Sequence, residues 1–151
     1  MHRNRGLSLV ELLAVTVILG VLVTAGFAIL RLDSPGNIGA ETVAHPLAKD
    51  LQYARRLAIT TGNDHYLVLT TSGSSVTGYT IYDGGTSTAV DAYRAIPPYV
   101  TVTITPTGSQ TPSLTFDGQA TASFTFTLAG PNQSFAVSVL AATGRPAVSP
   151  L

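Results

Sequence analysis

Glu11 is the ionisable residue whose surroundings restrict its chemistry most. Its carboxylate lies within an apolar run from Leu7 to Leu30, and nineteen uncharged residues separate it from Arg31. On membrane-insertion scales, an acidic side chain at the centre of a transmembrane helix costs about 2.5–3.5 kcal/mol, so such groups are rare without a partner. We therefore expect Glu11 to need a cationic partner.

The histidines and cysteines supply no catalytic or metal-binding pattern. The sequence has no cysteine, and His2, His45 and His65 are far apart without the spacing of metal ligands. His65 directly follows Asp64, but it lies at the expected start of a strand without a serine or cysteine nucleophile context. We expect no enzymatic activity and no cofactor.

Two acidic positions in a turn-rich segment are a further candidate for metal binding. Asp83-Gly84-Gly85 and Asp91 could contribute to a calcium loop, but calcium takes about six to eight oxygen ligands. Two carboxylates eight residues apart supply too few of them. A hairpin tip is the better interpretation, and we expect no metal site.

Basic and aromatic residues give weak candidates for surface contacts. Arg55 and Arg56 are adjacent on an expected helix, where neighbouring side chains diverge by about 100°, so we expect two solvated arginines and no shared patch. Arg145 is the single arginine in residues 144–151 and is a weak candidate for a ligand contact. Four tyrosines are either exposed contact residues or ordinary strand packing: Tyr79, Tyr82, Tyr93 and Tyr99.

The apolar run that contains Glu11 has the length of a membrane span. Its 24 residues, Leu7–Leu30, reach roughly 36 Å as a helix, against a hydrocarbon core of about 30 Å. Arg3 and Arg5 precede it, so the positive-inside rule keeps the N-terminus in the cytoplasm and exports the residues after Arg31.

Three alternatives for this run fit less well. A secretory signal peptide has an apolar region of about 7–15 residues and a small-residue cleavage site, and no Ala-x-Ala sequence precedes Arg31. A plain signal anchor leaves Glu11 unexplained. A buried helix of a soluble protein fails because the rest of the chain is too small to surround 24 apolar residues.

An amphipathic helix is expected after the apolar run. Residues 31–40 are rich in turn formers. A stripe then recurs at spacings of three and four, through Val43/Ala44, Leu47/Ala48, Leu51, Ala54 and Leu57/Ala58. Because Pro46 is tolerated only in a first turn, we expect the helix to begin near His45, with residues 41–44 looser. Gly62 is the expected stop.

The remaining sequence alternates like β-strands separated by turn residues. Six strands are expected, at His65–Thr70, Val76–Tyr82, Tyr99–Thr105, Ser113–Asp117, Ala122–Leu128 and Ser134–Leu140. The last two should form a core hairpin, and Ile96-Pro97-Pro98 should mark a bend or an edge. The fold class is therefore α+β: a long N-terminal transmembrane helix, an amphipathic helix segment and an all-antiparallel β domain.

The segment Gly6-Leu7-Ser8-Leu9-Val10-Glu11-Leu12-Leu13 resembles the prepilin processing motif of type IV pilins and type II secretion pseudopilins. The resemblance implies that a prepilin peptidase cleaves after Gly6 and methylates the new amine of Leu7. Glu11 would be the fifth mature residue, and the amine of a neighbouring subunit's Leu7 would supply its cation. Two departures are leucine instead of the family's usual phenylalanine at position 7, and Ala28 instead of a kinking proline.

The later sequence is similar to the GspH/FimT-type minor pseudopilin domain. The similarity is carried by Leu51-x-x-Ala54-Arg55-x-x-Ala58-Ile59-x-x-Gly62, by Val137-Ser138-Val139 and by Thr143-Gly144-Arg145. It implies a pilin-like fold with a leader at 1–6, a transmembrane and assembly helix at 7–30, a turn and amphipathic helix at 31–62, and an antiparallel β domain at 63–151. The implied location is the bacterial inner membrane, with a cytoplasmic N-terminus, a periplasmic C-terminal domain and, after assembly, a place in a filament.

Three functions remain in consideration. The leading one is a minor (pseudo)pilin subunit whose partners are other pilin or pseudopilin subunits, the prepilin peptidase and the inner membrane. The second is a FimT-like DNA-binding minor pilin for natural transformation. The third is a membrane-anchored β domain unrelated to filaments, which Gly6 and Glu11 argue against. Without the leader, six basic residues face eight acidic ones, so DNA binding is not expected.

Overall fold

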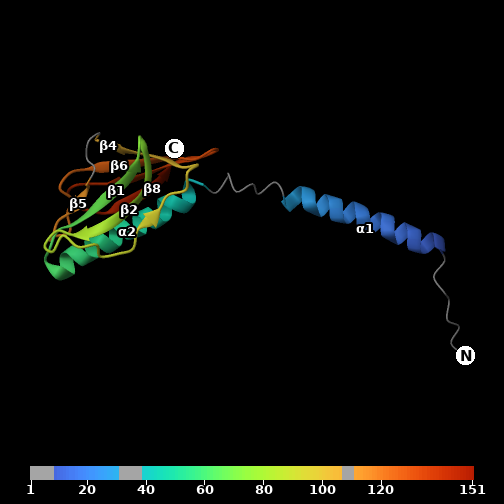
Figure 1. The fold of residues 1–151 in the computed structure, drawn as a ribbon, viewed down its shortest axis with the longest axis horizontal. Coiled ribbons are helices and arrows are strands. Elements are labelled where there is room, and N and C mark those ends of the chain that lie inside the picture. Colours follow the sequence, from blue (N-terminus) through green and yellow to red (C-terminus); the bar gives the residue numbers. More distant parts are fainter. Residues whose placement is uncertain (1–8, 31–38, 107–110) are drawn as a thin grey trace, which may run out of the picture. The chain divides into compact units, whose positions relative to one another are not determined.

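The chain forms two compact units, residues 1–34 and 35–151. The computed structural model describes residues 9–30, 39–106 and 111–151. The first unit contains helix α1 (Leu9–Leu30), and the second contains helix α2 (Glu41–Thr61) followed by eight strands (Figure 1). All strand pairs are antiparallel, which confirms the α+β class expected from the sequence.

Helix α1 is apolar on all its sides. Its apolar side chains between Leu9 and Val23 are exposed within the unit, from 49% for Val15 to 80% for Leu9. Among the residues that the structure describes, no helix is both long and apolar enough to cross a membrane.

Helix α2 is amphipathic and begins earlier than the sequence predicts. The expected start near His45 is wrong, because the helix begins at Glu41 and contains Pro46. The amide groups of Val43 and Ala44 both donate to the Ala40 carbonyl, and both side chains are buried. Their burial offsets the one helical hydrogen bond that a proline ring removes in the second turn.

The predicted end of α2 is confirmed. Gly62 has a φ of 74°, in the left-handed region that favours glycine, and its N–H donates to the Ala58 carbonyl at 3.0 Å. Along α2, one face is buried and the opposite face is exposed, which is the pattern that the stripe predicts.

The strands form two four-stranded sheets. The first sheet has the order β3-β2-β1-β5 and the second has the order β4-β6-β7-β8. The first contains β1 (His65–Ser72), β2 (Ser75–Asp83), β3 (Arg94–Ala95) and β5 (Ser113–Leu114). The second contains β4 (Thr101–Thr105), β6 (Phe124–Ala129), β7 (Ser134–Val139) and β8 (Pro146–Pro150).

Three features of the strand prediction are corrected. Strands β3 and β8 were not expected from the sequence: β3 has only two residues, and β8 has a proline at each end. The expected strand Ser113–Asp117 ends at Leu114, because the Gly118 N–H donates to the Thr115 carbonyl and closes a turn. Both missed strands lie at sheet edges, where prolines and short pairings are tolerated.

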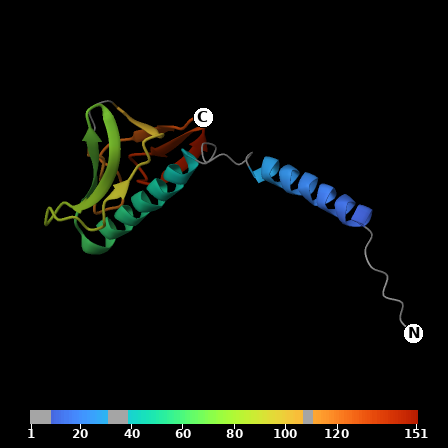
Figure 2. The ribbon, with the colours of Figure 1, turned by 45° about the vertical axis from the view of Figure 1, so that its right-hand side comes forward.

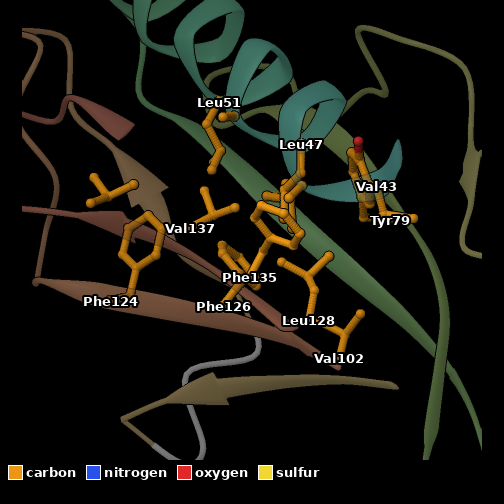
Figure 3. Close-up of a cluster of buried hydrophobic side chains, with 14 of the residues drawn as sticks. Val43, Leu47, Leu51, Tyr79, Val102, Phe124, Phe126, Leu128, Phe135 and Val137 are labelled. Atoms are coloured by element: carbon orange, nitrogen blue, oxygen red, sulfur yellow. The ribbon is translucent and has the colours of Figure 1, made fainter. Parts of the chain in front are cut away.

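The core lies between α2 and the two sheets. The predicted hairpin is confirmed: in the β6–β7 pairing, Phe124 faces Val139 and Phe126 faces Val137, and all four side chains are buried. Leu47 and Leu51 of α2 point toward these side chains (Figure 3). In Figures 1 and 2, α2 (teal to green) runs along one side of the strands. The second unit therefore has its own hydrophobic core between α2 and the two sheets.

Candidate functional site

Glu11 lies in the first turn of α1. It is exposed, and it forms no ion pair with any residue that the structure describes. Apolar side chains surround it along the helix, including Leu9, Val10 and Leu12, each more than half exposed. A contiguous apolar surface of this kind marks a site of protein or membrane interaction. The predicted processing residues Gly6 and Leu7 lie outside the described residues.

Arg145 lies in a second candidate site, which the structure forms on the other unit. A cavity of about 260 Å³ is lined by Gln52, Arg55, Arg56, Ile59, Arg145 and Pro146. The helix supplies the first four residues, and the loop before β8 together with the first residue of β8 supplies the other two. We refer to this set of six residues as the arginine pocket. The expectation that Arg55 and Arg56 share no patch is therefore wrong, since both border one cavity.

Arg55 has a structural role within the arginine pocket. Its Nε donates to the Gly118 carbonyl at 2.8 Å and to the Thr143 carbonyl at 3.1 Å. These bonds tie α2 to the loops that precede β6 and β8. Gly118 and Gly144 both have positive φ, and a Cβ on Gly144 would lie 2.3 Å from the Gly118 carbonyl oxygen. Close approach of these two glycines brings Arg145 beside the helix.

Arg94 lies outside the arginine pocket and is already paired. Its guanidinium contacts the Asp50 carboxylate at 3.4 Å and the Asp91 carboxylate at 3.2 Å, and these two charges raise its pKa. Asp50 also accepts a 2.8 Å hydrogen bond from the Tyr79 hydroxyl. Burial and the neighbouring Asp50 raise the pKa of Tyr79. This network fastens β2 and β3 to α2.

The four tyrosines proposed as contact residues divide into two groups. Tyr79 is buried, so it is not an exposed contact residue, and Tyr82 is half-buried and stacks on Tyr66 with ring centroids 5.7 Å apart. Tyr93 and Tyr99 are exposed. The hydroxyl of Tyr93 donates to the Thr77 carbonyl at 2.7 Å, so part of its role is to hold the chain over β2.

The acidic candidates for calcium do not converge. Asp83 accepts hydrogen bonds from the Gly85 N–H at 2.7 Å and the Asn63 amide at 3.4 Å, and these bonds hold the pKa of Asp83 below its usual value. Asp91 contacts Arg94 instead. Among the described residues, no group of three or more acidic, histidine or cysteine side chains is placed to hold a metal ion.

His65 is completely buried and is separated from the acidic residue beside it. Its Nδ1 lies 3.0 Å from the Asn63 carbonyl, whereas Asp64 accepts a hydrogen bond from the Phe116 N–H at 2.9 Å. The two side chains therefore have different partners, and His65 is a core residue that substrate cannot reach.

The comparisons with known proteins agree with this architecture. Residues 43–144 match the family described as "Type II transport protein GspH", and residues 1–27 match the "Prokaryotic N-terminal methylation motif". No curated protein sequence matches the chain.

Solved structures share the fold at low sequence identity. The type IV minor pilin FimU of Pseudomonas aeruginosa has a TM-score of 0.59 and 16% identity, over 73% of this chain and 87% of that chain. The minor pseudopilin EpsH from the type 2 secretion system of Vibrio cholerae has a TM-score of 0.57 and 12% identity, over 75% of this chain and 96% of that chain. The family match spans more than half of the sequence and covers most of α2 and strands β1 to β7, so this chain belongs to the GspH family of type II transport proteins and carries a prokaryotic N-terminal methylation motif.

Proposed function

We propose that the chain is a minor subunit of a type II secretion pseudopilus or a related type IV filament, with no catalytic role. One observation carries the proposal: Glu11, the fifth residue from Leu7 within the methylation motif, lies on a helix whose described apolar side chains are all exposed. Such a helix requires a covering of lipid or of other helices. For a filament subunit, the membrane would cover this helix before assembly, and neighbouring helices would cover it afterwards.

Processing would create the charge that Glu11 needs. Cleavage after Gly6 by the prepilin peptidase releases the amine of Leu7, and methylation leaves it cationic. In the filament, that amine on one subunit would lie against the Glu11 carboxylate of the next, so that two charges buried among apolar helices neutralise each other.

The membrane span and its topology belong to the same proposal. The expected span covers residues 7–30, of which 7 and 8 lie outside the described residues. The apolar character of the run and the leader residues Arg3 and Arg5 support an inner-membrane anchor with the N-terminus in the cytoplasm. The unit of residues 35–151 would then be exported and would lie on the outside of the assembled filament.

The charge distribution of the second unit favours the filament subunit over the DNA receptor. That unit contains five lysines and arginines against six acidic residues. Arg94 is paired with two carboxylates, and Lys49 is the remaining cation outside the arginine pocket. Phosphate contacts along a strand require several unpaired cations in a row, so we expect no DNA binding tighter than about 10⁻⁴ M near physiological salt.

Mass spectrometry of the chain purified from its own cells tests the proposal. We expect the mature protein to begin at a methylated Leu7 when the prepilin peptidase is present and to retain Met1 when it is deleted. Gly6→Leu should block cleavage, whereas Gly6→Ala is the control, whose smaller side chain should still allow partial cleavage. An intact Met1 in cells with an active peptidase would refute the proposal.

A further inference from the structure

We propose that the arginine pocket binds a carboxylate group presented by a neighbouring subunit of the filament. The proposal rests on the proposed function, because it names a partner surface for the same assembly. The arginine pocket lies in the unit of residues 35–151, whereas Glu11 lies in the N-terminal helix. The contact proposed at each place can therefore be tested separately.

The positive charge of the arginine pocket is not balanced locally. Three guanidinium groups, those of Arg55, Arg56 and Arg145, border one cavity. Among the described residues, none of the three forms an ion pair with an acidic side chain. The nearby loop acid Asp117 is used within its own turn, where it accepts hydrogen bonds from the Thr115 hydroxyl and the Gln119 N–H. The second unit has more acidic than basic residues, yet its charge at this cavity is positive.

The arginine pocket is also partly preorganised. The Nε of Arg55 donates to both carbonyls and so fixes the side chain. The two terminal nitrogens of the guanidinium take no part in these two bonds. Arg56 and Arg145 are exposed, and the structure gives their guanidinium groups no hydrogen bond within the described residues. Ile59 and Pro146 add an apolar wall. Arginine forks match a carboxylate with two parallel hydrogen bonds, and adjacent apolar surface strengthens them.

The small size of the cavity favours one small anionic group over a nucleic acid strand. The volume of about 260 Å³ is open to solvent and is bordered by one face of α2, the loop before β8 and the first residue of β8. A strand would need further cations beyond its rim. Lys49 and Arg94 do not line the cavity, and Arg94 is neutralised by Asp50 and Asp91.

The carboxylate is best supplied by a neighbouring subunit. A single carboxylate free in solution would bind such an exposed pocket weakly, because exposed ion pairs contribute only about 0.2–1 kcal/mol. A subunit already held in a filament presents its side chains at a high effective concentration. An Asp or Glu side chain of a neighbouring subunit is therefore the occupant that we propose.

The test measures how much of the full-length chain enters filaments in its own cells, relative to the membrane pool. The test variant is Arg56→Gln combined with Arg145→Gln, which keeps polarity and approximate size while removing both charges. Lys49→Gln is the matched control, an exposed cation on the same helix. Arg55 stays unchanged because its loss would disturb the loops. Protease resistance of each variant reports whether the fold is intact.

We expect the double variant to enter filaments about tenfold less than the parent, the effect of losing one good charge-assisted contact, with protease resistance unchanged. Arg145→Glu should be worse, and an Asp→Lys or Glu→Lys change in another subunit should restore it. Normal assembly of the double variant would overturn the inference. Micromolar oligonucleotide binding by the detergent-solubilised full chain, weakened by Arg145→Gln, would also overturn it in favour of nucleic acid. Absence of the parent chain from filaments would instead contradict the proposed function.

Discussion

The two long helices have nearly the same length but opposite apolar patterns. Helix α1 has 22 residues and presents apolar side chains on all sides, and those described are exposed within its unit. Helix α2 has 21 residues and buries one face, including Leu47 and Leu51, against the two sheets. The contrast separates two arrangements of apolar surface: α2 buries its apolar face against the sheets of its own unit, whereas the described apolar side chains of α1 stay exposed within theirs.

The charged residues of the two units differ in the same way. In the second unit, Asp50, Asp91 and Arg94 form one network, and Asp64 and Asp83 accept backbone hydrogen bonds. In the first unit, Glu11 forms no ion pair with a described residue. Substitutions that break these internal contacts of the second unit should therefore change stability, whereas substitution of Glu11 should change assembly.

The largest effect on stability is expected from the core of the second unit. Phe126 is fully buried, so Phe126→Ala should lower the free energy of unfolding by about 3–5 kcal/mol. Urea unfolding of the full chain in detergent measures the loss. The control is Phe116→Ala, since Phe116 is 61% exposed and its loss should cost no more than about 0.5 kcal/mol. Equal losses for both would show that the core is assigned to the wrong residues.

A smaller effect is expected where two loops approach each other beneath the arginine pocket. Gly144 has a φ of 57°, and an added Cβ would lie 2.3 Å from the Gly118 carbonyl oxygen, so Gly144→Ala combines strain with a clash. We expect it to cost about 2–3 kcal/mol. Gly62 has a φ of 74° with nothing within 4 Å, so Gly62→Ala should cost only about 1 kcal/mol. Thermal unfolding of both variants measures the two losses of stability. A larger loss for Gly62→Ala than for Gly144→Ala would contradict the close approach of the two loops.

Tyr79 should give a pH-dependent effect of about 1–2 kcal/mol. Tyr79→Phe removes the hydrogen bond to Asp50, a charged acceptor. Burial and Asp50 raise the pKa of Tyr79, so the folded state keeps the phenolic proton while the unfolded state loses it above about pH 10. The contribution is therefore complete below pH 10 and declines as the pH rises further.

Denaturant unfolding of the parent and Tyr79→Phe between pH 7 and 11 measures this difference. The gap in unfolding free energy should be constant up to about pH 9 and should narrow above about pH 10. A gap that widened with rising pH would contradict the contact between Tyr79 and Asp50.

The smallest effect is expected from removal of the first unit. Residues 38–151 should fold without the N-terminal helix, because their core closes between α2 and the sheets. In the same detergent, the unfolding free energies of this fragment and of the full chain should agree within about 0.5 kcal/mol. An aggregated fragment without β-rich circular dichroism would show that α1 belongs to the fold.

Local patterns predicted much of this fold. The apolar stripe of α2, the left-handed stop at Gly62 and the alternation in β6 depend on residues near one another in sequence, and all three are confirmed. In β7 the alternation is interrupted, because Ala136 is buried together with Phe135 and Val137. The predicted start of α2 near His45 was wrong, because burial of Val43 and Ala44 outweighs the local effect of Pro46.

Features set by long-range pairing could not be predicted from local patterns. The edge strand β8 carries prolines at both ends and pairs with β7 through tertiary contacts. The arginine pocket joins α2 to a residue ninety positions later in the sequence, Arg55 to Arg145. The available sequence signal was the pair of turn glycines, Gly118 and Gly144, and only the structure shows that they approach each other.

Glu11→Val tests most directly the claim that α1 serves assembly and not folding. The variant removes a carboxylate from an apolar helix, so membrane insertion should be as good as in the parent or better. The measurement is the fraction of the full-length chain in sheared filaments relative to the membrane pool, with urea unfolding of the same preparations. We predict unchanged unfolding of the second unit and a loss of filament incorporation of about tenfold or more, since the buried amine of the next subunit loses its counter-charge. Normal incorporation of Glu11→Val would contradict the account.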